Sequence, residues 1–208
     1  LAKAYGSSIG KTLLEYNGEN VLKIKARAMT AAGSDARMGG CSKPVMINSG
    51  SGNQGMTVSI PVIVYAKELK KEKEDLYRAL ILSNLISIYQ KRYIGKLSAF
   101  CGVVTAAAAS GAGIGYLLGF TKEKIEKIII NTVATTGGMV CDGAKPSCAS
   151  KISLAVENAI SAVQMADKGV SFSSGEGIVG ESADETIKNI GQMAKLGMRT
   201  TDVEILNI

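Results

Sequence analysis

Residues 97–120 restrict the possible folds more than any other part of this sequence. These 24 residues contain no charged side chain, and a run of that length is long enough to cross a bilayer. Most of them are Ala, Gly, Ser or Thr, however, and few are the Leu, Ile or Phe that drive membrane insertion. We therefore expect a central helix that is buried on all sides in a soluble protein. An integral membrane protein or a non-catalytic scaffold is the alternative from another class.

The composition favours an all-α protein with a single compact domain of several helices. A chain of 208 residues can bury a sizeable core. Three Phe, seven Tyr and no Trp leave few of the aromatic side chains that stabilise sheets. Apolar periodicity and turn residues predict helices over residues 2–16, 19–32, 74–92, 97–120, 121–137, 150–168 and 182–197.

Local signals define some helix ends and leave one segment ambiguous. Thr121 is a predicted N-cap, and Ser182 begins a capping box with Glu185. Residues 56–66 are apolar throughout, so periodicity does not separate a buried strand from a buried helix. Because Pro61 disfavours a central strand, we interpret this segment as a helix that begins at Gly55, with the proline near its first turns.

The charge pattern indicates neither a nucleic-acid partner nor a membrane partner. The net charge is +6, but much of it lies in mixed runs such as residues 67–75. Nucleic-acid binding favours basic residues clustered on one surface with stacking aromatic side chains, which the sequence lacks. Four cysteines in a chain of this length are not a disulfide scaffold, so we expect a cytoplasmic protein.

The absence of histidine narrows the chemistry further. It excludes Ser-His-Asp and Cys-His catalysis and histidine-ligated zinc or iron, so metal binding would require thiolates or carboxylates. Cys141 and Cys148 lie seven residues apart in a loop with Gly and Pro, and Cys101 lies forty residues upstream of Cys141. Thiolates suit iron–sulfur clusters, and three protein ligands would leave one iron open to substrate. Ordinary buried cysteines are the alternative, and spacing alone leaves Cys101 undecided.

Two further segments have residues typical of anion binding. The run SGSGNQG (49–55) presents backbone N–H groups and short polar side chains to a carboxylate or phosphate, although a flexible turn has the same composition. A similar Ser-Gly-Asn loop holds the substrate carboxylate in pyridoxal-phosphate enzymes that catalyse β-elimination. Such an enzyme is the second interpretation, because no α/β pattern and no lysine in a recognisable Schiff-base context accompany the loop here. Arg37 is a candidate for a bidentate bond to a carboxylate, and a salt bridge to Asp35 or to another acidic residue is the alternative.

Five motifs in order along the chain resemble the L-cysteine desulfidase family, which is related to the α chain of iron–sulfur L-serine dehydratase. They are SDARMGG (34–40), NSGSGNQG (48–55), LSAFC (97–101), GMVCDGA (138–144) and GEGIV (175–179). The resemblance implies an oxygen-sensitive [4Fe-4S] lyase that does not use pyridoxal phosphate. Such an enzyme removes sulfide from L-cysteine, or water from L-serine, and leaves pyruvate and ammonia.

The resemblance also assigns residues. It implies that the cluster ligands are Cys101, Cys141 and Cys148, and that the substrate-side loop contains Ser51, Gly52 and Asn53.

Family members also carry a Gly-Cys-Thr-Glu-Pro motif near the N-terminus, which this sequence lacks. We therefore expect residues 1–208 to be the C-terminal, cluster-carrying domain of a longer protein, with the base unassigned. Cys41 matches no required position. The choice between L-cysteine and L-serine stays open, as do loss of the cluster in air and a homo-oligomeric state.

Overall fold

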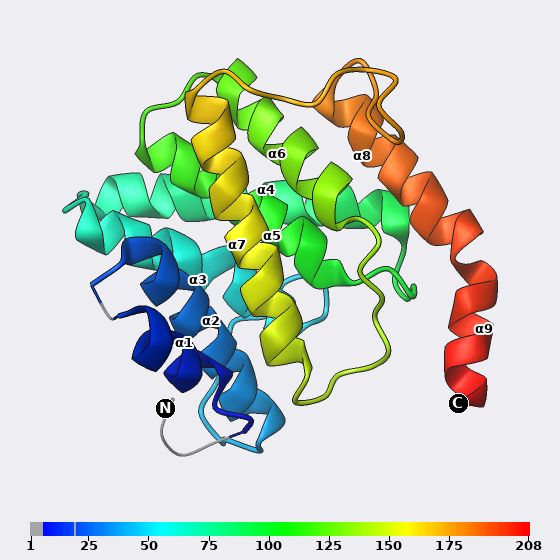
Figure 1. Ribbon diagram of the computed structural model, residues 1–208, viewed down its shortest axis with the longest axis horizontal. Coiled ribbons are helices and arrows are strands. Elements are labelled where there is room, and N and C mark those ends of the chain that lie inside the picture. Colours follow the sequence, from blue (N-terminus) through cyan, green and yellow to red (C-terminus); the bar gives the residue numbers. More distant parts are fainter. Residues whose placement is uncertain (1–5, 19) are drawn as a thin grey trace.

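The computed structural model describes residues 6–18 and 20–208, and these residues form an all-α fold, as predicted (Figure 1). A π-helical turn, η1, covers Met193–Gly197. The α-helices are α1 (Ile9–Asn17), α2 (Leu22–Met38), α3 (Gly52–Glu68), α4 (Lys73–Ile94), α5 (Gly102–Leu117), α6 (Lys122–Thr136), α7 (Cys148–Asp167), α8 (Ala183–Gln192) and α9 (Arg199–Asn207).

Helix α5 lies at the centre of the molecule, with α3, α4, α6 and α7 packed around it (Figure 1). Tyr116 is its only residue that is not buried. The central buried helix predicted from residues 97–120 is therefore confirmed. Its predicted start was wrong: α5 begins at Gly102, because the preceding residues are extended and pair with the segment that follows α6. Within the described ranges, no helix has the length and apolar character that a bilayer span requires.

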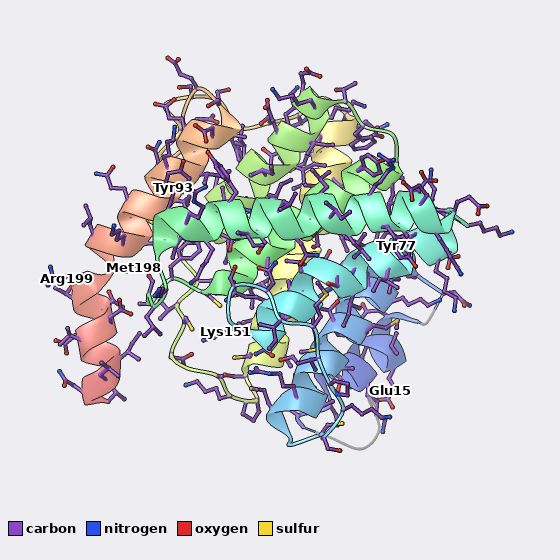
Figure 2. The ribbon with its side chains drawn as sticks, turned by 180° about the vertical axis from the view of Figure 1, so that it is seen from behind. Glu15, Tyr77, Tyr93, Lys151, Met198 and Arg199 are labelled. Atoms are coloured by element: carbon purple, nitrogen blue, oxygen red, sulfur yellow. The ribbon has the colours of Figure 1, made fainter. Side chains whose placement is uncertain are left out.

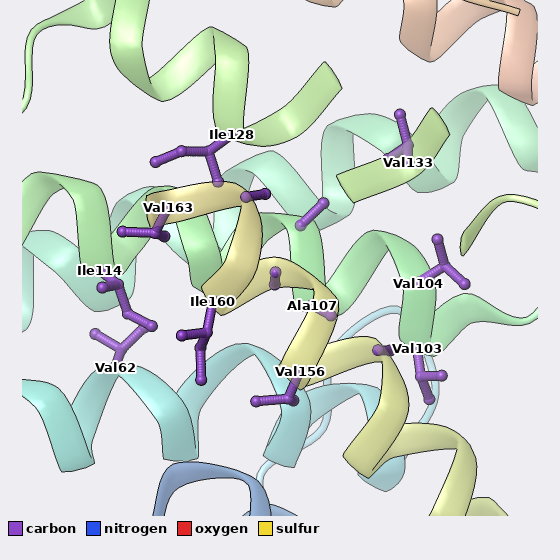
Figure 3. Close-up of a cluster of buried hydrophobic side chains, with 14 of the residues drawn as sticks. Val62, Val103, Val104, Ala107, Ile114, Ile128, Val133, Val156, Ile160 and Val163 are labelled. Atoms are coloured by element: carbon purple, nitrogen blue, oxygen red, sulfur yellow. The ribbon is translucent and has the colours of Figure 1, made fainter. Parts of the chain in front are cut away.

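Small residues allow the neighbouring helices to approach α5 closely. A Cβ atom added to Gly113 would lie 2.9 Å from the Cγ2 atom of Val62 on α3 and 3.1 Å from the carbonyl oxygen of Ala79 on α4. Figure 3 shows the larger side chains that fill the remaining space, including Ile114 and Ile128, which are fully buried. Because protein cores are close-packed, this arrangement tolerates little added volume around α5.

Helix α2 is longer than predicted. The helix was predicted over residues 19–32, but α2 continues through Gly33 to Met38 and so includes most of the SDARMGG motif. Gly33 serves close packing instead of a turn, since a Cβ atom on it would lie 2.9 Å from the Sδ atom of Met56. The predicted helical residues 2–5 and 19 lie outside the described residues.

Helix α3 confirms the helical interpretation of residues 56–66, and the strand alternative is wrong. The helix begins at Gly52, three residues before the predicted start. Ser51 defines this start, because its Oγ atom accepts a hydrogen bond from the Gln54 N–H at 3.3 Å. Pro61 therefore lies in the helix interior and not near the first turns.

The two predicted N-caps are confirmed. Thr121 accepts a hydrogen bond from the Lys124 N–H at 3.5 Å, and Ser182 accepts one from the Glu185 N–H at 3.1 Å. The chain beyond Gln192 departs from the prediction of one last helix: it passes through η1 into α9, which has no buried residue. Because α9 buries no residue, apolar periodicity gave no sign of it in the sequence.

Replacing Gly113 with valine tests the close packing around α5. We expect the free energy of unfolding to fall by about 1–3 kcal/mol, because the branched side chain overpacks the contact with Val62 and Ala79. Gly138→Val is the matched control, since a Cβ atom at Gly138 meets nothing within 4 Å. Denaturant unfolding of both variants measures the difference. Equal stability of the two variants would contradict the packing argument.

Candidate functional site

Two of the three predicted ligand cysteines are brought together by a short backbone pairing. The Cys101 N–H donates to the Met139 carbonyl at 3.0 Å, and the Cys141 N–H donates to the Ala99 carbonyl at 2.6 Å. This pairing joins the residues before α5 to those after α6 and brings the two thiols close enough for each to shift the pKa of the other. All four cysteines of the chain are free thiols.

The third predicted ligand lies on the same loop but apart from this pair. Cys148 is the first residue of α7, and its thiol donates to the Gly143 carbonyl at 3.7 Å. Across residues 6–18 and 20–208, no group of three Cys, Asp or Glu side chains is arranged to hold a metal ion. The structure therefore pairs Cys101 with Cys141, whereas Cys148 lies at the far end of the loop that joins α6 to α7.

The paired thiols differ in their acidity. The hydrogen bond from Cys101 lowers the pKa of Cys141 from 9.0 to about 6, and the Gly143 N–H contributes in the same direction. The same hydrogen bond and then burial raise the pKa of Cys101 well above its ordinary value. The two shifts run in opposite directions, so Cys141 is the more acidic thiol of the pair.

Positive charge surrounds the thiols. Lys151 of α7 donates to the Val140 carbonyl at 2.9 Å and forms an ion pair with Asp142, and its charge acts on all three thiols. Figure 2 labels Lys151, which lies beside the loop that joins α6 to α7. Burial lowers the pKa of Lys91 on α4, while the charges of Cys141 and Cys101 oppose that shift.

The positions of Cys101 and Cys148 at helix starts also favour ionised thiols. Cys101 is the N-cap of α5 and Cys148 is the first residue of α7. The positive end of a helix dipole favours a thiolate or another anion nearby. Thiolates held near lysines and helix N-termini are a donor set that fits an iron–sulfur cluster. Cys148 does not join the other two thiols in one metal-binding group among the described residues.

The predicted substrate-side residues lie together at the start of α3. Ser49 and Gly50 have φ angles of 51° and 80°, so the loop turns sharply before Ser51 caps the helix. Gly52 and Asn53 are buried, and the Asn53 Oδ1 atom accepts a hydrogen bond from Ser34 at 3.2 Å. The glycine-rich run therefore leads directly into the first turn of α3.

Arg37 lies against this helix start. A Cβ atom on Gly52 would be 2.7 Å from the Arg37 Nε atom, so only glycine leaves room for the guanidinium group. The Arg37 Nη1 atom is buried and has no hydrogen-bond partner among the described residues. The proposed salt bridge with Asp35 is not formed, because Asp35 instead accepts hydrogen bonds from Ser7 and Ile9 at the start of α1.

Two cavities adjoin these residues. The first has a volume of about 340 Å³ and is lined by Arg37, Cys41 and Lys43, among others, so Cys41 lies with the arginine and not with the thiol pair. The second has a volume of about 560 Å³ and lies between the glycine-rich loop, at Ser49, and the end of α4, where Lys91 contributes to the wall. Both cavities carry positive charge next to the start of α3.

Gln54 connects the two parts of the site, and sequence reasoning did not single it out. Its side chain is only 8% exposed, and a Cβ atom on Gly102 would lie 2.5 Å from its Nε2 atom. Gln54 therefore spans from the start of α3 to the residue after Cys101, and its Oε1 atom has no hydrogen-bond partner in the described residues. Its place in the SGSGNQG motif was the available signal. Lys91 and Lys151 had no comparable signal.

Comparison with known proteins places the chain in a family. Residues 1–207 match the family model described as serine dehydratase alpha chain. The chain is 57% identical over 208 residues to a UPF0597 protein of Lachnoclostridium phytofermentans, covering 100% of this chain and 50% of that protein. It is 55% identical over 204 residues to a UPF0597 protein of Desulfitobacterium hafniense, covering 98% of this chain and 47% of that protein. No solved structure matches.

The structure is an all-α fold in which paired cysteines lie near a glycine-rich helix start. The chain is a member of the serine dehydratase α chain family. It spans about half the length of the curated relatives that it matches. The resemblance inferred from the five motifs is therefore confirmed as membership of this family.

The acidity of the Cys141 thiol is testable in cluster-free protein. We expect its alkylation rate to rise with a midpoint near the pKa of about 6, below the ordinary 9.0. The thiolate is the reactive form, so the rate should be at its plateau by neutral pH. Mass spectrometry of peptides after short iodoacetamide pulses at a series of pH values measures it.

A pair of variants at Cys101 provides the control. Cys101→Ala removes the hydrogen-bond donor and should move the midpoint upward, whereas Cys101→Ser keeps a donor and should move it less. An unchanged midpoint in Cys101→Ala would contradict the assigned hydrogen bond.

Proposed function

We propose that this chain carries the iron–sulfur cluster of a lyase that acts without pyridoxal phosphate. The proposed reaction is β-elimination on L-cysteine, with pyruvate, ammonia and hydrogen sulfide as products. The same chemistry on L-serine, with loss of water, is the alternative. The observation that carries the proposal is the Cys101–Cys141 thiol pair, set in positive surroundings next to a glycine-rich helix start. Membership of the serine dehydratase α chain family supports it.

Cys101, Cys141 and Cys148 are the proposed ligands of a [4Fe-4S] cluster. When bound by three thiolates, such a cluster supplies a Lewis-acidic iron that polarises the leaving group of a substrate. The lowered pKa of Cys141 favours its thiolate, which is the form that binds a metal. Lys151 offsets the negative charge that three thiolates bring together. The reducing cytoplasm, the proposed location, keeps such thiols free.

The start of α3 is the proposed site for the substrate carboxylate. Arg37 offers a buried nitrogen without a partner, and the N–H groups of Gly52 and Asn53 belong to the first turn of the helix. Ser51 caps this turn and fixes its direction. A carboxylate held here gains charge-assisted hydrogen bonds from the guanidinium group and from the helix end. Gln54 packs between this position and Cys101, which supports one continuous site.

Cluster binding is the first test. After anaerobic treatment with iron and sulfide, we expect bound iron and a broad absorbance in the blue part of the visible spectrum. Cys141→Ser should lose both signals because it removes a thiolate ligand. Cys41→Ser is the matched control and should keep both, since Cys41 lies in a different cavity. An iron-free wild-type protein, or equal loss in the two variants, would refute the cluster assignment.

Substrate binding is the second test, and it uses the cluster-loaded protein. L-cysteine should change the visible absorbance, with a half-saturation concentration that rises roughly tenfold or more in Arg37→Lys, because lysine lacks the planar fork. Bound iron should stay unchanged in this variant. Arg199→Lys, on exposed α9, is the control and should bind as the wild type does.

Comparing pyruvate release from L-cysteine and L-serine by the full-length, anaerobically prepared protein then identifies the substrate. If neither amino acid alters the absorbance, the proposed substrate class is wrong.

A further inference from the structure

One face of α4 carries an exposed row of side chains with a regular spacing. The apolar centre of the row consists of Ile81, Leu85 and Ile88, which are 58%, 59% and 45% exposed. The opposite face of α4 is buried against the body of the protein. In the rear view, α4 runs across the front of the molecule between the labelled Tyr77 and Tyr93 (Figure 2). No other described element passes in front of α4 in that view.

The spacing of the row is that of a coiled-coil seam. Its members alternate between steps of four and three residues: Glu74, Arg78, Ile81, Leu85, Ile88 and Arg92. A 4-3 alternation is the heptad pattern by which one helix packs its knobs into the holes of another. The buried face of α4 already serves the core, so this seam is a second, unpartnered contact surface on the same helix.

The seam is complementary to itself when two copies run antiparallel. With a twofold axis near residue 83, Ile81 faces the partner's Leu85, and Arg78 lies beside the partner's Ile88. At the ends, Glu74 meets the partner's Arg92, so opposite charges pair on both sides. An antiparallel arrangement also places the helix dipoles in their favourable relative direction. A parallel arrangement would instead set Glu74 against its own copy and Arg92 against its own copy.

We propose that two copies of this chain associate through an antiparallel pairing of their α4 helices. The pairing removes three apolar side chains per chain from water and forms two symmetry-related Glu74–Arg92 contacts. Such a contact is isologous, the usual form of homodimers, because the same patch serves both chains. Arg78 exchanges its exposed ion pair with Glu74, 2.8 Å long in the single chain, for packing at the seam. The proposal does not depend on the proposed function.

The mass of the protein in solution tests the pairing. Light scattering after gel filtration should give 21.7 kDa at high dilution and twice that mass as concentration rises into the high micromolar range. Leu85→Lys places a charge at the centre of the seam and should abolish the larger species. Leu154→Lys is the matched control, because Leu154 is 56% exposed on α7, away from the seam. Circular dichroism verifies that both variants are folded.

Charge reversal distinguishes this geometry from other dimers. Glu74→Arg or Arg92→Glu alone sets like charges together at the seam ends and should raise the dimer dissociation constant about tenfold. The double variant restores opposite charges and should recover most of the affinity. A mass of 21.7 kDa at every concentration overturns the proposal. Equal effects of Leu85→Lys and Leu154→Lys, or a double variant no better than the single ones, overturn it as well.

Discussion

The close approach of four helices to α5 is the constraint on which the rest of the structure depends. Ala and Gly along α5 let the neighbouring helices approach its backbone closely. The close packing of this core therefore depends on small residues on α5. This packing also positions the functional groups. Gly102 leaves room for Gln54, and Cys101 immediately before it becomes the N-cap of α5. The buried helix therefore organises the core and presents the first cysteine.

The electrostatics of the candidate site come from segments that are distant in sequence. The Cys141 thiol is acidic because Cys101, on a different segment, donates a hydrogen bond to it. Lys91 and Lys151 add positive charge from α4 and α7. Neither lysine lies in a motif that distinguishes it from a surface lysine. Their role follows from how the helices pack, because the packing brings Lys91 of α4 and Lys151 of α7 near the thiols.

Residues close in sequence serve different purposes because successive residues of a helix point about 100° apart. Asp35 faces α1 and holds its first turn through Ser7 and Ile9. Arg37, two residues later, faces α3 and lies against Gly52. The motif that contains both residues is therefore part of a helix whose two faces stabilise the fold and build the site.

The sequence by itself determined the all-α class, the buried central helix and the caps at Thr121 and Ser182, because composition and local hydrogen bonding decide these features. The five motifs also identified the family. Only the tertiary structure decided that α2 continues through Gly33, that α3 begins at Gly52, and that Cys101 pairs with Cys141 while Cys148 stays apart. These outcomes depend on contacts between distant segments, whose packing energy outweighs local preference and leaves no periodic signal along the chain.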